Sequence, residues 1–248
     1  MTIKIKWLRK LIQIIALIIL LLPIWFTDLI WYGTYISAEL AGIDLTDPLT
    51  TLEIILASKT IWLPLIISAL PLTIAAIIFG RVFCSYICPL NFLLELIPIK
   101  RKKVLQARTL PLIALGIVLV LSAILSVPIF NIASPVFALM RVLIFGVGVE
   151  IILFALVIGA AFIWGQKIWC RTLCPLGAIY GLLGIKRRLA VVVDKNKCIN
   201  CGRCEKICSM GTSPLKNSFE DACLCTNCGD CIDACPKKAL KFSLKEGI

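Results

Sequence analysis

Four long apolar segments divide the first three quarters of the chain. They run over residues 11–30, 61–79, 109–129 and 147–164, and most charged residues gather between them. About 20 apolar residues are enough for a helix to cross the hydrocarbon core of a bilayer. The pattern therefore predicts an all-α membrane domain over residues 1–188, with four transmembrane helices.

Composition and charge support the same interpretation. Of the 248 residues, 60% are hydrophobic, which is more than a soluble domain usually has. Basic clusters lie before the first segment, at residues 4–10, and after the second, at residues 100–103. Because such clusters stay on the cytoplasmic side, we expect an integral protein of a prokaryotic cytoplasmic membrane with both termini in the cytoplasm. These clusters also account for the net charge of +12, so nucleic acid is not expected as a partner.

A short cysteine element occurs twice, which predicts an internal duplication. Cys84 and Cys88 are followed by Pro89, and Cys170 and Cys174 by Pro175, in both cases with the spacing C-x3-C-P. We expect repeat 1 over about residues 11–103 and repeat 2 over about 109–188. Each repeat would hold two helices and a short helix after the proline. Two parallel repeats are related by a pseudo-two-fold axis along the membrane normal, so the four cysteines could meet.

The role of these four cysteines stays open at the level of sequence. Four thiolates at one place could hold an iron ion or an iron–sulfur cluster, although tetrahedral thiolate also suits zinc. They could instead form redox-active dithiols or supply one reactive thiol. The simplest alternative is that they are small apolar residues packed at a helix end.

Eight further cysteines near the C-terminus form two runs with the spacing C-x2-C-x2-C-x3-C. Bacterial ferredoxins use this spacing to hold two [4Fe–4S] clusters, and the last cysteine of each run ligates the other cluster. The first predicted ligand set is therefore Cys198, Cys201, Cys204 and Cys235, and the second is Cys225, Cys228, Cys231 and Cys208. Cys223 lies outside both runs, and we expect it to be a buried thiol rather than a ligand.

These runs predict an α+β domain over residues 189–248, similar to a bacterial ferredoxin with two [4Fe–4S] clusters. Residues 189–194 are apolar and partly β-branched, which favours a strand. Phe242 and Leu244 are the expected partner strand. Cluster ligation needs thiolates, so this domain should face a reducing compartment, which agrees with a cytoplasmic C-terminus.

The combination of four apolar segments, two C-x3-C-P elements and two cysteine runs resembles the NapH-type family of membrane-bound quinol dehydrogenase ferredoxins. The resemblance covers essentially the whole chain. It implies electron exchange between the quinone pool and an iron–sulfur relay, within a hetero-oligomeric complex that includes a partner iron–sulfur or cytochrome redox protein. Whether the chain is itself an enzyme stays open.

A quinone substrate needs a polar partner, and the chain has no histidine. Haem b with histidine ligands is therefore excluded, and the candidates for the quinone site are Glu150, Asp28, Glu95 and Tyr86. Two other functions stay open. The chain could be a non-catalytic iron–sulfur wire and membrane anchor of a larger redox complex, or a ferredoxin-type metal reductase that assists assembly of another enzyme.

Overall fold

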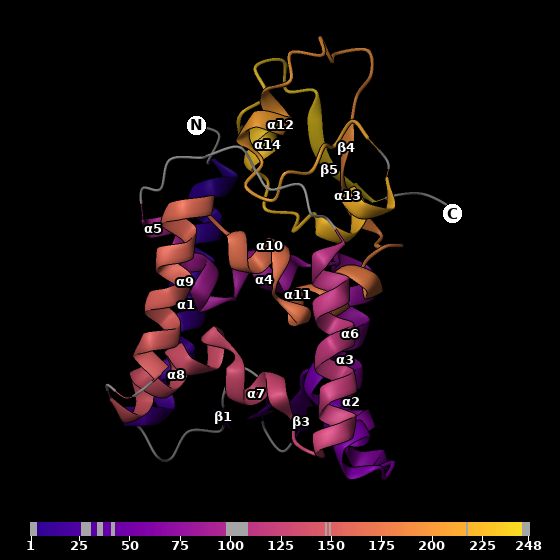
Figure 1. Cartoon of the computed structure of the whole chain (residues 1–248). Helices are drawn as coiled ribbons and strands as arrows, with labels where there is room; N and C mark the ends of the chain where they lie inside the picture. Colours follow the sequence, from indigo (N-terminus) through magenta and orange to yellow (C-terminus); the bar gives the residue numbers. More distant parts are fainter. Residues whose placement is uncertain are drawn as a thin grey trace.

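The computed structural model describes residues 4–25, 31–33, 37–40, 43–97, 109–146, 148, 150–216 and 218–244. Figure 1 shows two parts, a larger body of helices and a smaller C-terminal part that caps one end of it. We call the elements α1 to α11 the helical body and residues 189–244 the C-terminal part.

The helical body contains helices and a small sheet. Its helices are α1 (Ile5–Trp25), α2 (Pro48–Ser58), α3 (Leu63–Phe79), α4 (Val82–Tyr86), α5 (Pro89–Leu96), α6 (Leu110–Leu125), α7 (Ile129–Ala133), α8 (Pro135–Phe145), α9 (Glu150–Trp164), α10 (Ile168–Thr172) and α11 (Pro175–Leu183). Its strands are β1 (Trp31–Gly33), β2 (Ser37–Leu40) and β3 (Ile43–Thr46), which pair in that order and antiparallel.

The two cysteine elements occupy equivalent places in the body. In each, a short helix (α4 or α10) carries the first cysteine, and the second cysteine is the N-cap of the next helix (α5 or α11). Proline stands at the first turn of both α5 and α11, where its fixed φ and missing N–H are tolerated. The predicted helix start at Pro89 is confirmed.

Two apolar cores flank the cysteine elements. One contains Cys88 with Leu90, Leu94 and Val157, and partly buried Cys170 packs against it. The other contains Cys174 with Leu176, Leu115 and Tyr180, and partly buried Cys84 packs against it. Each core thus receives the second cysteine of one repeat and the first cysteine of the other.

The C-terminal part is built around a two-stranded antiparallel sheet. Strand β4 (Leu189–Val193) pairs with β5 (Leu240–Leu244), with Leu189 opposite Leu244 and Val191 opposite Phe242. This confirms the strand pairing predicted from the sequence. Three short helices complete this part: α12 (Arg203–Ile207), α13 (Phe219–Leu224) and α14 (Asp230–Asp233).

The prediction of four transmembrane helices is wrong. Within the ranges that the structure describes, no helix is both long enough and apolar enough to cross a membrane. Helices α3, α6 and α9 have only 17, 16 and 15 residues, because the chain turns to positive φ at Gly80, Ser126 and Gly165 directly after them. Helix α1 has 21 residues, but buried Arg9 and Gln13 lie in its first half.

The same finding overturns two related predictions. They are the integral membrane localisation with both termini in the cytoplasm and the description of the repeats as pairs of membrane-spanning helices. The apolar segments do form helices near the predicted places, but the lengths of α3, α6 and α9 were overestimated.

Candidate metal centres

The first predicted ligand set lies together at the far end of the C-terminal part. Cys198, Cys201, Cys204 and Cys235 line one cavity. Gly202 holds the loop in a left-handed turn at φ 68°, a conformation in which glycine carries no side-chain penalty. Cys201 is exposed, so this cavity reaches the protein surface.

The second predicted set lines a larger cavity within the C-terminal part, which Ile185 and Arg187 also line just after α11. Cys208, Cys225, Cys228 and Cys231 surround a space of about 420 Å³, with Cys204 of the first set at its edge. Burial raises the pKa of Cys231, and the neighbouring Cys228, Cys225 and Cys208 raise it further. The common lining shows that the fold has gathered this set around a single space.

The four C-x3-C-P cysteines line a third, small cavity inside the helical body. Cys84, Cys88, Cys170 and Cys174 surround about 20 Å³ together with Arg81. Burial raises the pKa of Cys88, Cys170 and Cys174 to about 12, and neighbouring cysteines of the same group add to the rise. The duplication therefore does bring two distant pairs of cysteines to one place.

Arg81 places a buried positive charge at this third cavity. It is 1% exposed, and its Nη1 and Nη2 donate to the carbonyl oxygens of Cys223 (3.2 Å) and Cys170 (3.3 Å). Burial raises the pKa of Cys84, while Arg81 opposes that rise through its charge and a hydrogen bond. Among the residues described, no carboxylate forms an ion pair with Arg81. A buried cation without such a partner is costly, so the cavity favours an anionic occupant.

The second and third cavities adjoin each other. Met210 and Thr226 line both of them, and the Oγ of Ser85 donates to the Thr226 carbonyl oxygen at 2.7 Å. Cys204 in turn lines both the first and the second cavity. The three groups of four cysteines therefore follow one another from the helical body to the outer end of the C-terminal part.

Within the described ranges, no three cysteine or acidic side chains lie close enough together to hold one metal ion.

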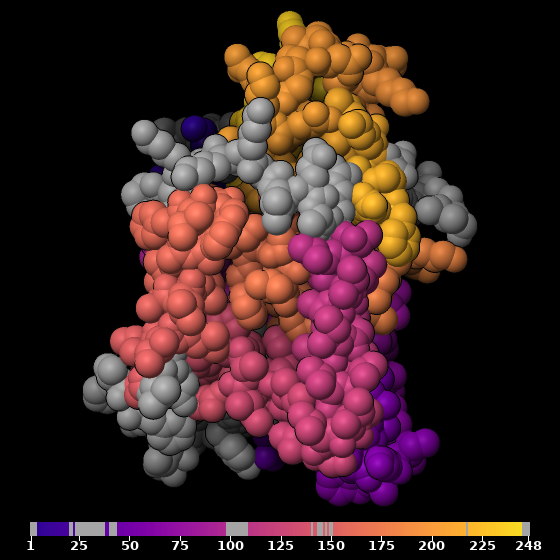
Figure 2. Space-filling view, viewed as in Figure 1, coloured from indigo at the N-terminus to yellow at the C-terminus, as the bar shows by residue number. Residues whose placement is uncertain are grey.

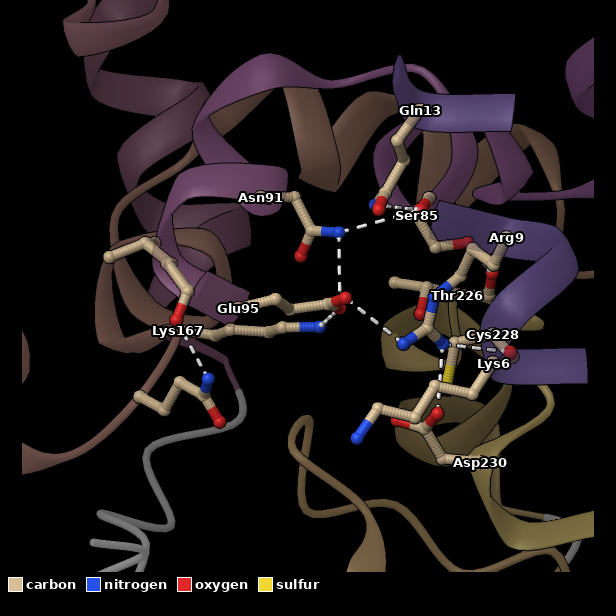
Figure 3. Close-up of polar contacts among 12 residues, drawn as sticks. Lys6, Arg9, Gln13, Ser85, Asn91, Glu95, Lys167, Thr226, Cys228 and Asp230 are labelled. Carbon is tan, nitrogen blue, oxygen red and sulfur yellow. Dashed lines mark hydrogen bonds and ion pairs between the residues drawn. The ribbon is translucent and has the colours of Figure 1, made fainter. Parts of the chain in front are cut away.

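A buried polar network fastens the two parts of the molecule beside the second cavity (Figure 3). Arg9 of α1 forms ion pairs of 3.0 Å with Glu95 of α5 and with Asp230 of α14, and donates to the Cys228 carbonyl oxygen at 2.8 Å. The backbone N–H groups of Ile5 and Lys6 donate to Asp233. The start of α1 is therefore held by the loop that carries the second cysteine run.

Two of the predicted quinone-site residues lie in or beside this network. Glu95 accepts from Lys167 at 2.6 Å and from Arg9 at 3.0 Å. Burial alone would raise its pKa, but these two cations lower it below the usual range. Tyr86 is partly buried near Arg9 and Asp230, and burial raises its pKa. Asp28 and the side chain of Glu150 lie outside the described residues.

The sequence did not identify the cations that organise these sites. Arg9 appeared only as a member of the first basic cluster, and Arg81 and Lys167 are basic residues just after the second and fourth apolar segments. One signal was available, because Lys167 follows Arg81 by 86 residues (167 − 81), the same offset as between Cys84 and Cys170. Cys223 is buried and lines none of the three cavities, as was expected of a thiol that is not a ligand.

Parts of the chain that contain these cysteines match known iron–sulfur protein families. Residues 60–106 and 147–191 each match a family described as a 4Fe-4S binding domain, and residues 190–212 match another family of the same description. The two matches to the first family contain the two C-x3-C-P elements. No solved structure matches the chain significantly.

Curated relatives match along nearly the whole chain. Ferredoxin-type protein NapH of Haemophilus influenzae is 32% identical over 96% of this chain and 88% of its own length. NapH of Escherichia coli and methylamine utilization ferredoxin-type protein MauN of Methylorubrum extorquens are each 32% identical over 97% of this chain and 90% of their own length. The chain is thus an iron–sulfur electron-transfer protein, and it belongs to the family of NapH ferredoxin-type proteins.

Proposed function

We propose that the chain carries electrons through three iron–sulfur centres in series. Two [4Fe–4S] clusters are assigned to the sets Cys198, Cys201, Cys204, Cys235 and Cys208, Cys225, Cys228, Cys231. A third is assigned to Cys84, Cys88, Cys170 and Cys174. The observation that carries the proposal is that each set of four lines one cavity and that neighbouring cavities share residues. We also keep the domain division at residues 188 and 189 as part of the proposal.

The buried charge of Arg81 supports a cluster at the C-x3-C-P cysteines over packed apolar thiols or a pair of dithiols. Four packed apolar thiols would leave Arg81 beside a neutral cavity, where a buried guanidinium is destabilising. A cluster with four thiolate ligands is anionic and would offset that charge. A pair of dithiols would be neutral when reduced at neutral pH, because burial raises the pKa of three of these cysteines to about 12. Arg81 therefore favours a cluster over free thiols.

The protein's own groups would prepare each cavity for its centre. A [4Fe–4S] cluster supplies a one-electron carrier that needs no proton. Gly202 and Gly229 turn the two loops at positive φ, so that backbone N–H groups can point toward the cluster sulfurs. Arg81 and Arg9 hold positive charge beside the third and second cavities. Positive charge next to a cluster favours its reduced form.

We further propose that a quinol supplies the electrons and that a partner oxidoreductase receives them. Oxidation of a quinol to a quinone releases two electrons, which the centres pass on singly, and two protons, which go to water. The support is membership of the NapH family together with the resemblance described above. Glu95 is engaged in ion pairs with Arg9 and Lys167, so Asp28, Glu150 and Tyr86 remain the candidates for the quinol site.

Reduction by a water-soluble quinol analogue under argon tests this function. The visible iron–sulfur absorbance should bleach, as it does with dithionite. A variant with serine at Cys84, Cys88, Cys170 and Cys174 should bleach with dithionite but much more slowly with quinol, because the first centre of the series is lost. Bleaching by dithionite alone in the unaltered protein would favour the non-catalytic wire. Oxidation of the reduced protein by Cu(II), with no response to quinone, would favour the metal reductase.

A further inference from the structure

The outermost end of the C-terminal part carries the first cysteine cavity. Figure 2 shows this end, in orange, projecting away from the helical body. Cys201 is exposed there, and Ile199 beside it is 59% exposed. Met210 and Thr226, which line the second and third cavities, are buried. The first cavity therefore offers a partner an approach from solvent at this end of the molecule.

Charge is distributed unevenly over the C-terminal part. Six exposed basic residues lie on or next to the segments that line the first cavity; we call them the cationic face, and they are Lys195, Lys197, Arg203, Lys237, Lys238 and Lys241. Lys197 pairs with Asp194 at 3.5 Å. Of the other acidic residues in this part, Asp230 pairs with Arg9 and Asp233 accepts from the start of α1, whereas Glu205 of α12 is exposed.

The cationic face surrounds an apolar centre. Ile199 and Leu215 are 59% and 39% exposed, and both line the first cavity together with Lys197, Arg203 and Lys237. Protein interfaces typically combine an apolar centre with a polar rim. Charges of one sign around such a centre steer a partner of opposite sign and fix its orientation.

We propose that the cationic face is the docking surface for a redox protein that presents carboxylates around its own centre. The proposal rests on the proposed function, because it takes the first cavity as the exit of the relay. In the exchange one electron passes from the reduced centre to the oxidised partner. No bond is formed or broken, and no proton is transferred.

Two small one-electron oxidants of opposite charge test where electrons leave. They are hexacyanoferrate(III), a trianion, and hexaammineruthenium(III), a trication, mixed with the dithionite-reduced protein in a stopped-flow instrument at low salt. The double variant Arg203→Glu, Lys237→Glu should react at least about threefold more slowly with the anion and faster with the cation, and added salt should remove both effects. A changed reduction potential would alter both rates in the same direction.

The matched control is the double variant Lys59→Glu, Arg188→Glu. It makes the same change in net charge at exposed residues away from the cationic face, since Lys59 follows α2 at the opposite end of the molecule (Figure 1). Its rates should stay close to those of the unaltered protein. Equal effects of the two double variants would overturn the proposal, because only the total charge would then matter.

A binding measurement separates docking from electron transfer. Fluorescein-labelled polyglutamate should bind the unaltered protein at low salt, as measured by anisotropy, and bind the Arg203→Glu, Lys237→Glu variant at least about tenfold more weakly. Vesicles of phosphatidylglycerol test the rival class of partner. Binding of vesicles but not of polyglutamate would assign the face to a lipid surface and overturn the proposal. This readout does not need clusters, so loss of bleaching with retained binding would contradict the proposed function alone.

Discussion

At the scale of single residues, buried charges decide how the sites are built. Arg9, Arg81 and Lys167 are each at most 2% exposed, and a buried charge is tolerated only with good partners. Local spacing predicted the cysteine sets, because a cluster loop uses ligands that are close in sequence. The charge partners could not be predicted in this way, since Glu95 lies 72 residues from Lys167 and 86 from Arg9.

Arg9→Met should weaken the junction between the two parts. The change leaves Glu95 and Asp230 without a shared cation and removes the bond to the Cys228 carbonyl oxygen. We expect a loss of about 3–5 kcal/mol in the free energy of unfolding, measured by urea denaturation. Arg188→Met is the control, because Arg188 is exposed. A loss under about 1 kcal/mol for Arg9→Met would show that the ion pairs contribute little.

Asp47→Asn should remove a pH dependence of stability. Burial raises the pKa of Asp47 from 3.8 to about 6, although the Tyr180 hydroxyl, which donates at 2.7 Å, opposes the rise. The folded state therefore holds this proton more tightly than the unfolded state does. Stability from this group is present below about pH 4 and is lost as the pH rises toward 6, by up to about 3 kcal/mol.

Asparagine can still cap α2 in place of Asp47, so the fold should be kept. The measurement is the free energy of unfolding at pH 4 to 7 for the unaltered protein and the variant, and the difference should level off above about pH 6. Asp44→Asn, at an exposed position, should leave the profile as it is. An unchanged slope in Asp47→Asn would mean that Asp47 does not titrate in this range.

At the scale of elements, helix ends and helix contacts set the geometry. Hydropathy predicted where the long helices lie but not where they stop, because the stops depend on backbone turns such as Ser126 at φ 55°. Hydropathy also did not predict the contacts between elements. Gly177 lies under Arg81, and Gly181 lies against the backbone and sulfur of Cys223, with no room for a side chain at either position. Helix α11 can therefore approach α13 closely and leave room for the Arg81 side chain.

Gly181→Ala should destabilise the contact between α11 and α13. A Cβ at this position would overlap the carbonyl oxygen and the sulfur of Cys223, so the helices must separate, at a cost of about 1–3 kcal/mol. Gly116→Ala in α6 is the matched control, since nothing lies within 4 Å of that site, and it should stabilise the helix by roughly 0.5–1 kcal/mol. Thermal unfolding should give a lower melting temperature for Gly181→Ala and a higher one for Gly116→Ala. Stabilisation by both substitutions would contradict the contact.

At the scale of the whole molecule, the chain connects a helical body to a C-terminal part through three neighbouring cysteine cavities. The duplication predicted that two pairs of cysteines could meet, and the structure brings them to one cavity. The sequence could not predict that Met210 and Thr226 would lie between that cavity and the next one. These contacts depend on how the two parts dock, and docking relies on side chains that are distant in the sequence.

Iron and acid-labile sulfide per chain, measured after anaerobic purification, test the central claim most directly. The unaltered protein should contain about twelve irons and the same number of sulfides. The variant with serine at Cys84, Cys88, Cys170 and Cys174 should contain about eight, while Cys223→Ser should keep about twelve. About eight irons in all three proteins would contradict the third centre and leave the four C-x3-C-P cysteines without a cluster.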